Sequence, residues 1–151
     1  MSVYISKNAE LFFKALEDVW VAEQTWRGSP NNAVWHCTQA AEKTLKGFLR
    51  CVNIDFDHRH ELEPLLESVL IEFEIPIEIS EHILLLDQYR LSLRYRNMSS
   101  DPSPEDAKIV ISRTKQIMQA FNENPKASQF MYEAKEVHIK MLESYCRKYS
   151  D

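Results

Sequence analysis

Glycine is almost absent from this chain, since its 151 residues include only two glycines, at positions 28 and 47. Strand-rich folds need many tight turns, and tight turns usually need glycine because it adopts positive φ angles without strain. Long stretches of the sequence are instead rich in Leu, Glu, Lys, Gln, Ala and Met, which favour helices. The sequence therefore predicts an all-α protein.

Apolar residues recur at helical spacing along most of the chain, most clearly between residues 107 and 121. Capping signals mark several boundaries: Gly28 at the end of the first helix, Ser29-Pro30 at the start of the second, and the capping-box-like run from Ser103 to Asp106. The expected helices cover about residues 6–26, 30–52, 60–72, 80–97, 103–121 and 125–149. We expect one domain, residues 1–151, built as an up-and-down helical bundle of about five core helices (about 5–122) plus a C-terminal helix.

The charge balance and the cysteines limit the classes of function. With 18 Lys and Arg against 23 Asp and Glu, the chain carries a net charge of -5, which argues against a broad surface for duplex nucleic acid but allows a local basic pocket. Cys37, Cys51 and Cys146 are far apart and predict buried apolar side chains in a reducing cytosol. Neither a signal peptide nor a run of roughly 20 apolar residues is present, so we expect a soluble, cytoplasmic protein.

The segment DFDHRHELE, residues 55–63, concentrates carboxylates and imidazoles in nine positions. As a metal site it would use Asp55, Asp57, His58 and His60. However, the sequence supplies no further His or Cys that would complete a tetrahedral set, and one loop would lose much entropy on ordering. We therefore expect no metal. The favoured interpretation is a helix start, in which Asp57 or His58 provides the cap and the following glutamates interact with the helix dipole.

Known catalytic and cofactor motifs are missing. The sequence has no G-x-x-x-x-G-K-[ST], no G-x-G-x-x-G, no G-x-S-x-G and no H-E-x-x-H, and two glycines cannot form a phosphate-binding loop. We therefore assign no catalytic residue and no cofactor.

Three segments together carry a family pattern. They are AVWHCTQAAEKTLKGFL (33–49), HEL (60–62) and LDQYRLSLRYRN (86–97). In this order they resemble the HEPN domain family (higher eukaryotes and prokaryotes nucleotide-binding) over about residues 5–122. The residues that match the family motifs are Gln39, Ala40, Glu42, Lys43, Leu45, Lys46, His60, Leu62, Tyr89, Arg94 and Tyr95.

The chain departs from this family in two places. Arg96 stands where the family has proline after Arg-Tyr. The ribonuclease branch also carries an Arg-x4-6-His motif, and no histidine follows Arg90, Arg94 or Arg113 within that range. Acid–base work on a ribose hydroxyl needs such a group beside the phosphate-binding arginine. The resemblance therefore implies the non-ribonuclease type, and we expect a protein that is not an enzyme.

The second and fourth expected helices would form a polar pocket between them, in which cations receive phosphates and polar or aromatic side chains orient a base or ribose. Its candidate ligand-binding residues are Gln39, Lys43, Lys46, Asp87, Arg90, Arg94, Tyr95 and Arg96. In the alternative interpretation, ion pairs among Glu42, Lys43, Asp87 and Arg94 fix helix register or a dimer seam. In this alternative interpretation His60 and Tyr89 also have structural roles.

These observations lead to three hypotheses for function. The first is a non-enzymatic, homodimeric HEPN-like module that binds a nucleotide or the end of a nucleic acid such as RNA. For this module the resemblance implies a nucleotidyltransferase-type protein partner, in a bacterial toxin–antitoxin or stress-response pair. The second hypothesis is a diverged, metal-independent endoribonuclease toxin, and the third is a purely structural dimeric interaction module.

Overall fold

The computed structural model describes residues 4–57, 59–95 and 101–148, and for residues 94 and 95 it describes the backbone alone. These residues contain no strand and form helices whose bounds follow. The helices are α1 (Lys7–Thr25), α2 (Pro30–Cys51), α3 (Leu62–Val69), α4 (Ile77–Tyr95), α5 (Pro104–Asn122) and α6 (Ser128–Lys148). The all-α prediction is confirmed. The largest boundary differences are a shorter α3, and an α4 that already begins in the IPIEI run.

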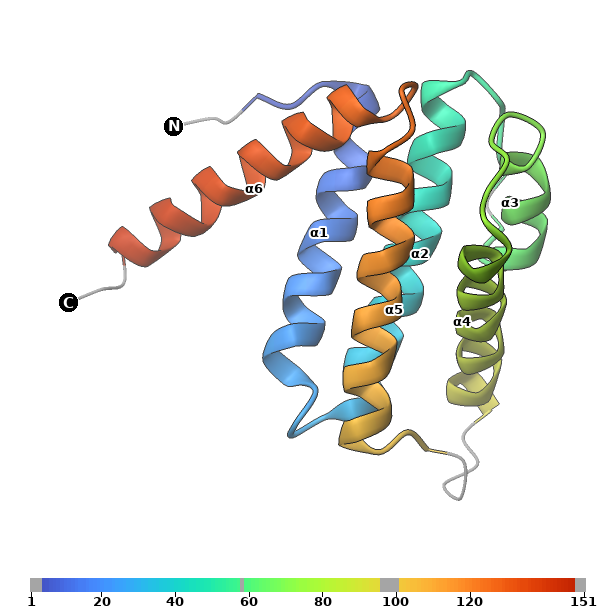
Figure 1. The fold of residues 1–151 in the computed structure, drawn as a ribbon. Coiled ribbons are helices and arrows are strands. Elements are labelled where there is room, and N and C mark those ends of the chain that lie inside the picture. Colours follow the sequence, from blue (N-terminus) through green and yellow to red (C-terminus); the bar gives the residue numbers. More distant parts are fainter. Residues whose placement is uncertain (1–3, 58, 96–100, 149–151) are drawn as a thin grey trace.

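Helix α2 forms the centre of the bundle and contacts α1, α3, α4 and α5. The axes of α1, α2, α4 and α5 run side by side in alternating directions (Figure 1), which is the up-and-down arrangement expected for short connections. Helix α6 instead packs on α1 and α5 at one end of the bundle and then extends away from it (Figure 1).

The core follows the apolar stripes of the sequence. The rings of Phe48 (α2), Phe73 (the α3–α4 connection) and Phe121 (α5) pack together with centroids 5.2 to 5.6 Å apart. Since α2 is covered on several sides, even its polar residues Glu42 and Lys46 are buried. Burial of such groups requires partners, and this requirement shapes the polar region described below.

The helix ends test the capping predictions. The capping box is confirmed, since Ser103 Oγ accepts a hydrogen bond from the Asp106 N–H and the Asp106 carboxylate accepts one from the Ser103 N–H. The prediction for Gly28 is wrong, because neither glycine has a positive φ angle and the residue that caps α1 is Trp26, in right-handed geometry. Among the described residues the left-handed conformation falls on Asn53 (φ 57°), just after α2, a residue that tolerates it.

The part of the chain that the structure describes has neither a membrane-spanning helix nor a metal-binding cluster. No helix there is both long and apolar enough to cross a membrane. Nor do three or more His, Cys, Asp or Glu side chains gather there in an arrangement that would hold a metal ion. His58 lies outside the described residues, and Asp57 accepts a hydrogen bond from the Arg59 N–H instead of capping α3.

Candidate functional site

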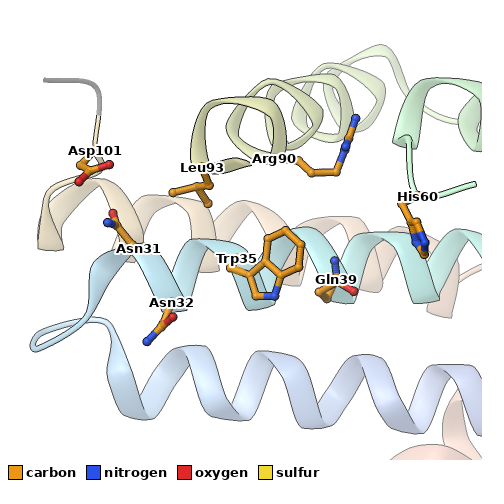
Figure 2. A pocket seen from close by; sticks show the side chains of 8 residues that line it. All are labelled: Asn31, Asn32, Trp35, Gln39, His60, Arg90, Leu93 and Asp101. Atoms are coloured by element: carbon orange, nitrogen blue, oxygen red, sulfur yellow. The ribbon is translucent and has the colours of Figure 1, made fainter. Parts of the chain in front are cut away.

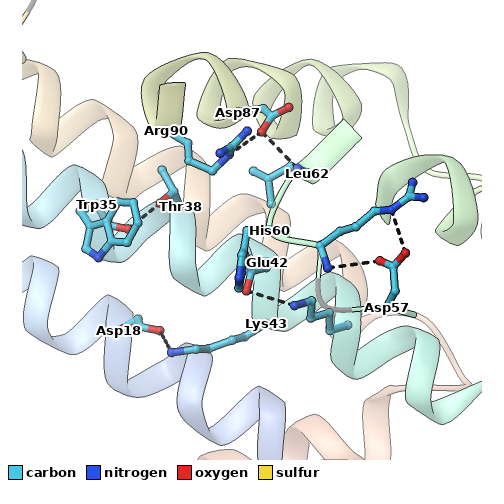
Figure 3. A network of polar contacts seen from close by, with 12 residues as sticks. Asp18, Trp35, Thr38, Glu42, Lys43, Asp57, His60, Leu62, Asp87 and Arg90 are labelled. Carbon is cyan, nitrogen blue, oxygen red and sulfur yellow. Dashed lines mark hydrogen bonds and ion pairs between the residues drawn. The ribbon is translucent and has the colours of Figure 1, made fainter. Parts of the chain in front are cut away.

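Of the polar residues singled out on the second and fourth predicted helices, those that the structure describes lie on α2 and α4, which are in contact. The structure separates them into three ion-pair groups, drawn in Figure 3, and one pocket. The side chains of Arg94 and Tyr95, and the whole of Arg96, lie outside the described part of the chain.

The first ion-pair group joins α2 to α1. Asp18 is 8% exposed, and its carboxylate lies 2.6 Å from Lys43 Nζ and 2.8 Å from His36 Nδ1. Lys43 therefore neutralises a buried carboxylate on α1. Sequence reasoning missed Asp18, although position 18 continues the buried apolar face of Ala15 and Ala22. A carboxylate on such a face needs a cation from a neighbouring helix.

The second group is centred on Glu42, whose side chain is 7% exposed. Its Oε2 atom lies 3.3 Å from Lys46 Nζ, and its Oε1 atom lies 3.2 Å from Nδ1 of His60, in the segment that leads into α3. The Lys46 ammonium also lies 5.8 Å from the centre of the Phe56 ring. Glu42 therefore holds the α3 entry segment against α2, and Lys46 is already paired.

The third group joins α4 to the start of α3. One oxygen of Asp87 accepts hydrogen bonds from Arg90 Nε (3.0 Å) and from the backbone N–H of Leu62 (3.1 Å). This N–H is in the first turn of α3, where no helical partner exists. Asp87 thus caps α3 from another helix. Tyr89 is half-buried and packs against the core.

Beside these groups is a cavity of about 570 Å³ between α2 and α4. Figure 2 shows its lining residues in a row along α2, from Asp101 and Asn31 at one end to His60 at the other. The lining residues are Asn31, Asn32, Trp35, Gln39, His60, Arg90, Leu93 and Asp101. This set contains Gln39 and Arg90 from the predicted ligand-binding residues, and His60 from those predicted to be structural. Lys43, Lys46 and Asp87 are not in it.

Residues missed by sequence reasoning give the pocket its aromatic surface and half of its polar groups. Trp35 is 42% exposed, which is unusual for a large aromatic side chain on the central helix of a bundle. Asn31, Trp35 and Gln39 are spaced four residues apart and therefore lie on one face of α2. That spacing is a signal that the sequence already contained.

The orientation of Arg90 and of His60 is fixed by their partners. Arg90 is 6% exposed, and its Nε atom donates to Asp87, so the guanidinium plane has a defined direction. The ring of His60 is held at Nδ1 by Glu42, while 71% of its side chain is exposed. The pocket thus combines an aromatic face, three amide side chains, one guanidinium and one imidazole with the carboxylate of Asp101 and the apolar side chain of Leu93.

The thiols lie apart from this pocket. Burial raises the pKa of Cys37 to about 12 and that of Cys51 to about 11. Near neutral pH both remain protonated and are poor nucleophiles. The prediction of a buried side chain is wrong for Cys146, which is exposed near the end of α6.

A comparison with protein-family models matches residues 8–124 to the HEPN domain. These residues include α2, the α3 entry segment and α4, and they end before α6. Comparisons with curated proteins and with solved structures return no significant match. Because the family model covers well over half of the chain, from α1 to α5, the protein belongs to the HEPN domain family.

Proposed function

We propose that this protein is a non-enzymatic HEPN module that binds a nucleotide, or the end of a single-stranded nucleic acid, in the pocket between α2 and α4. The observation that carries the proposal is the exposed face of Trp35, with amide groups on either side and Arg90 and His60 toward one end (Figure 2). Aromatic faces stack on bases, amides hydrogen-bond with base edges, and guanidinium groups bind phosphate.

The dimensions of the pocket support this assignment. A volume of about 570 Å³ lies within the range of small-molecule sites. From Asn31 to Gln39 the helix advances eight residues, which is about 12 Å along its axis. A base stacked on Trp35 would therefore lie beside the amides while its phosphate extends toward Arg90 and His60.

The ion pairs indicate which cationic side chain is available to bind the phosphate. Lys43 and Lys46 neutralise buried carboxylates, so a phosphate that recruited either one would leave a carboxylate unpaired in the interior, which is costly. Arg90 lines the pocket and uses Nε for Asp87, so its Nη atoms are the donors that a phosphate would contact. We therefore assign the phosphate to Arg90.

Isothermal titration with AMP, ATP and a short single-stranded oligonucleotide tests the proposal. Trp35→Ala removes the stacking surface, which is worth about 1–3 kcal/mol per base, so we expect affinity to fall by roughly 5- to 150-fold. Arg90→Lys should weaken binding to the phosphorylated ligands and leave binding of adenosine almost unchanged.

Trp20→Ala is the matched control, because Trp20 is 41% exposed and lies outside this pocket. Its affinity should equal that of the native chain. No heat with any of the ligands, or an equal loss for Trp20→Ala and Trp35→Ala, would contradict the proposal.

The family resemblance also leads us to propose a cytoplasmic homodimer that works beside a nucleotidyltransferase-type partner, as in a bacterial toxin–antitoxin pair. Binding of such a partner is measured by co-expressing the two proteins and purifying through a tag on one of them. A stable complex supports the proposal. The partner's absence from the purified material contradicts it.

A second candidate function, metal-independent RNA cleavage, is favoured by one specific observation. His60 and Arg90 line the same pocket although they lie thirty residues apart, so an imidazole is available despite the missing motif. His60 would accept the proton of a ribose 2′-hydroxyl while O2′ bonds to phosphorus and the P–O5′ bond breaks. A water molecule protonates the 5′-oxygen, and the product is a 2′,3′-cyclic phosphate. Cleavage of RNA in chelator that is lost in His60→Gln supports this function, and an inert native protein contradicts it.

A further inference from the structure

A second cavity lies beside α6, the helix that follows the matched HEPN region. Its volume is about 290 Å³, and α1, α5 and α6 line it. Helix α6 contributes Met131, Lys135 and His138, which are spaced four and three residues apart and therefore share one face. Figure 1 shows α6 packed on the end of the bundle before it extends away. The cavity thus depends on a helix outside the matched HEPN region.

Five apolar side chains line this cavity. They are Leu16, Val19 and Trp20 of α1, Met118 of α5 and Met131 of α6. Trp20 is 41% exposed, so its indole is accessible to a small ligand. An indole and two thioether side chains form an adaptable apolar surface, and methionine makes favourable contacts with aromatic rings. These walls can accommodate the apolar part of a ligand.

The charged groups of the cavity leave one cation available. Lys115 Nζ is 2.9 Å from the carboxylate of Glu23, and these two charges balance each other. Lys135 is half-buried, and its side chain has neither an ion pair nor a hydrogen bond with any residue that the structure describes. Burial lowers the pKa of His138, so its ring is largely neutral near pH 7. Glu17, whose charge acts on His138, does not line the cavity.

We propose that this cavity binds a small monocarboxylate with an apolar body, whose carboxylate pairs with Lys135 and whose body lies against Trp20. A single carboxylate matches the one ammonium that no protein carboxylate balances. The apolar walls partly shield this pair from water, which strengthens it. A phosphate dianion fits less well, because the other lysine of the cavity, Lys115, is already engaged by Glu23. The volume is at the lower limit of known ligand sites, which indicates a small occupant.

This inference does not rest on nucleotide binding between α2 and α4. The two cavities share no lining residue, and each contains one exposed tryptophan, Trp35 in the first and Trp20 in the second. The indole N–H signals of these two residues therefore report on the two ligands separately.

A titration of the ¹⁵N-labelled full chain with 3-phenylpropionate tests the proposal. The Trp20 signal should shift progressively and saturate, while the Trp35 signal stays in place. The amide 3-phenylpropionamide has nearly the same shape without the charge, so its affinity should be roughly tenfold lower. Equal affinities for the acid and the amide would overturn the proposal, as would a Trp20 signal that does not change at millimolar acid.

Substitution of Lys135 removes the charge on the protein side. Lys135→Gln should lower the affinity for the acid roughly tenfold and leave that for the amide almost unchanged. Lys140→Gln is the matched control, because Lys140 is exposed on the same helix and does not line the cavity, and its affinities should equal those of the native chain. Equal affinities of the two lysine variants for the acid would contradict an ion pair at Lys135.

The tryptophan variants separate this proposal from nucleotide binding. Trp20→Ala should weaken binding of both the acid and the amide, because it removes the apolar contact that the two share. Trp35→Ala should leave the affinity for 3-phenylpropionate unchanged although it weakens nucleotide binding, so the two proposals fail independently. An equal loss of acid binding in Trp20→Ala and Trp35→Ala would contradict the assignment to this cavity. Far-ultraviolet circular dichroism checks that each variant is folded.

Discussion

Asp18 illustrates how a single buried residue organises this protein. Its carboxylate contacts both His36 and Lys43 of α2, at 2.8 and 2.6 Å, and its side chain is 10% exposed. A carboxylate at such a position is stable only while its partners neutralise it. The pair with Lys43 consequently connects the first two helices in a fixed register and keeps this lysine away from the pocket.

Asp18→Asn tests this role. The substitution retains the shape of the side chain but removes the charge, leaving Lys43 without its carboxylate at a largely buried position. We expect the free energy of unfolding in urea to fall by about 2 kcal/mol, below the cost of a completely buried pair because Lys43 is partly exposed. Lys14→Ala is the control. It removes an exposed pair with Glu10 and should cost less than about 0.5 kcal/mol. Equal losses in the two variants would show that Asp18 has no special role.

At the scale of the helices, the close approach of α1 and α2 depends on Gly47. A Cβ atom at this position would lie 2.8 Å from the ring of Phe12, which is completely buried. Alanine would gain up to about 1 kcal/mol of helix propensity, but overpacking of a core costs about 1–3 kcal/mol. Gly47 is therefore required for the close packing of α1 against α2, and not for a turn.

The two glycines form a matched pair for measurement. Gly47→Ala should lower the free energy of unfolding by about 1–2 kcal/mol, since the ring of Phe12 has little room to move. Gly28→Ala should leave it unchanged or raise it by up to about 1 kcal/mol, because a Cβ atom there meets nothing within 4 Å and φ is not positive. Chemical denaturation of the two variants measures the contrast, and a reversed order would refute this account of the α1–α2 contact.

The contact between α1 and α6 predicts a dependence on pH. Burial lowers the pKa of His138 below its ordinary value of 6.5, against the opposing effect of Glu17. The unfolded chain therefore binds more protons than the folded chain in the range between the two pKa values. The contribution of His138 to stability is complete above about pH 6.5 and decreases as pH falls through the lowered pKa.

Urea unfolding at pH 7.5 and pH 5.5 measures this dependence. Other groups also titrate in this range, so the comparison is made with His138→Gln, which cannot bind a proton. The loss of stability on acidification should be smaller in the variant than in the native chain. An equal loss in both would show that α6 docking does not involve this titration.

The sequence predicted the helices well because helical periodicity is local. The stripe from Ala107 to Phe121 and the capping box at Ser103 each lie within a few turns of one helix. The partners of the polar side chains could not be obtained in this way. Asp18 meets Lys43 across 25 residues, and Asp87 meets Leu62 across the same distance. These contacts depend on which helices are neighbours, which periodicity does not specify.

The pocket shows the same division between local and tertiary information. Gln39 was predicted from a family motif and Arg90 from its place beside Asp87 on the fourth helix, and both line the pocket. Trp35 was missed although it shares a face of α2 with Gln39, because an aromatic residue at helical spacing is usually part of the core. Its exposure is a property of the assembled bundle.

At the scale of the whole molecule, two cavities lie in different surroundings. The proposed nucleotide pocket lies between α2 and α4, and a second cavity is lined by α1, α5 and α6. The chain has three tryptophans, one in the pocket (Trp35), one at the second cavity (Trp20), and Trp26 next to Arg27 and Lys108. Each indole N–H therefore reports on a different place.

The most direct measurement of the central claim is a titration of the three indole N–H signals in a ¹H–¹⁵N correlation spectrum, assigned by single Trp→Phe substitutions. Addition of AMP should shift the Trp35 signal progressively and leave those of Trp20 and Trp26 in place. Saturation of this shift gives the affinity, which should agree with calorimetry. A spectrum that does not change at millimolar AMP, or a shift confined to Trp20, would contradict nucleotide binding between α2 and α4.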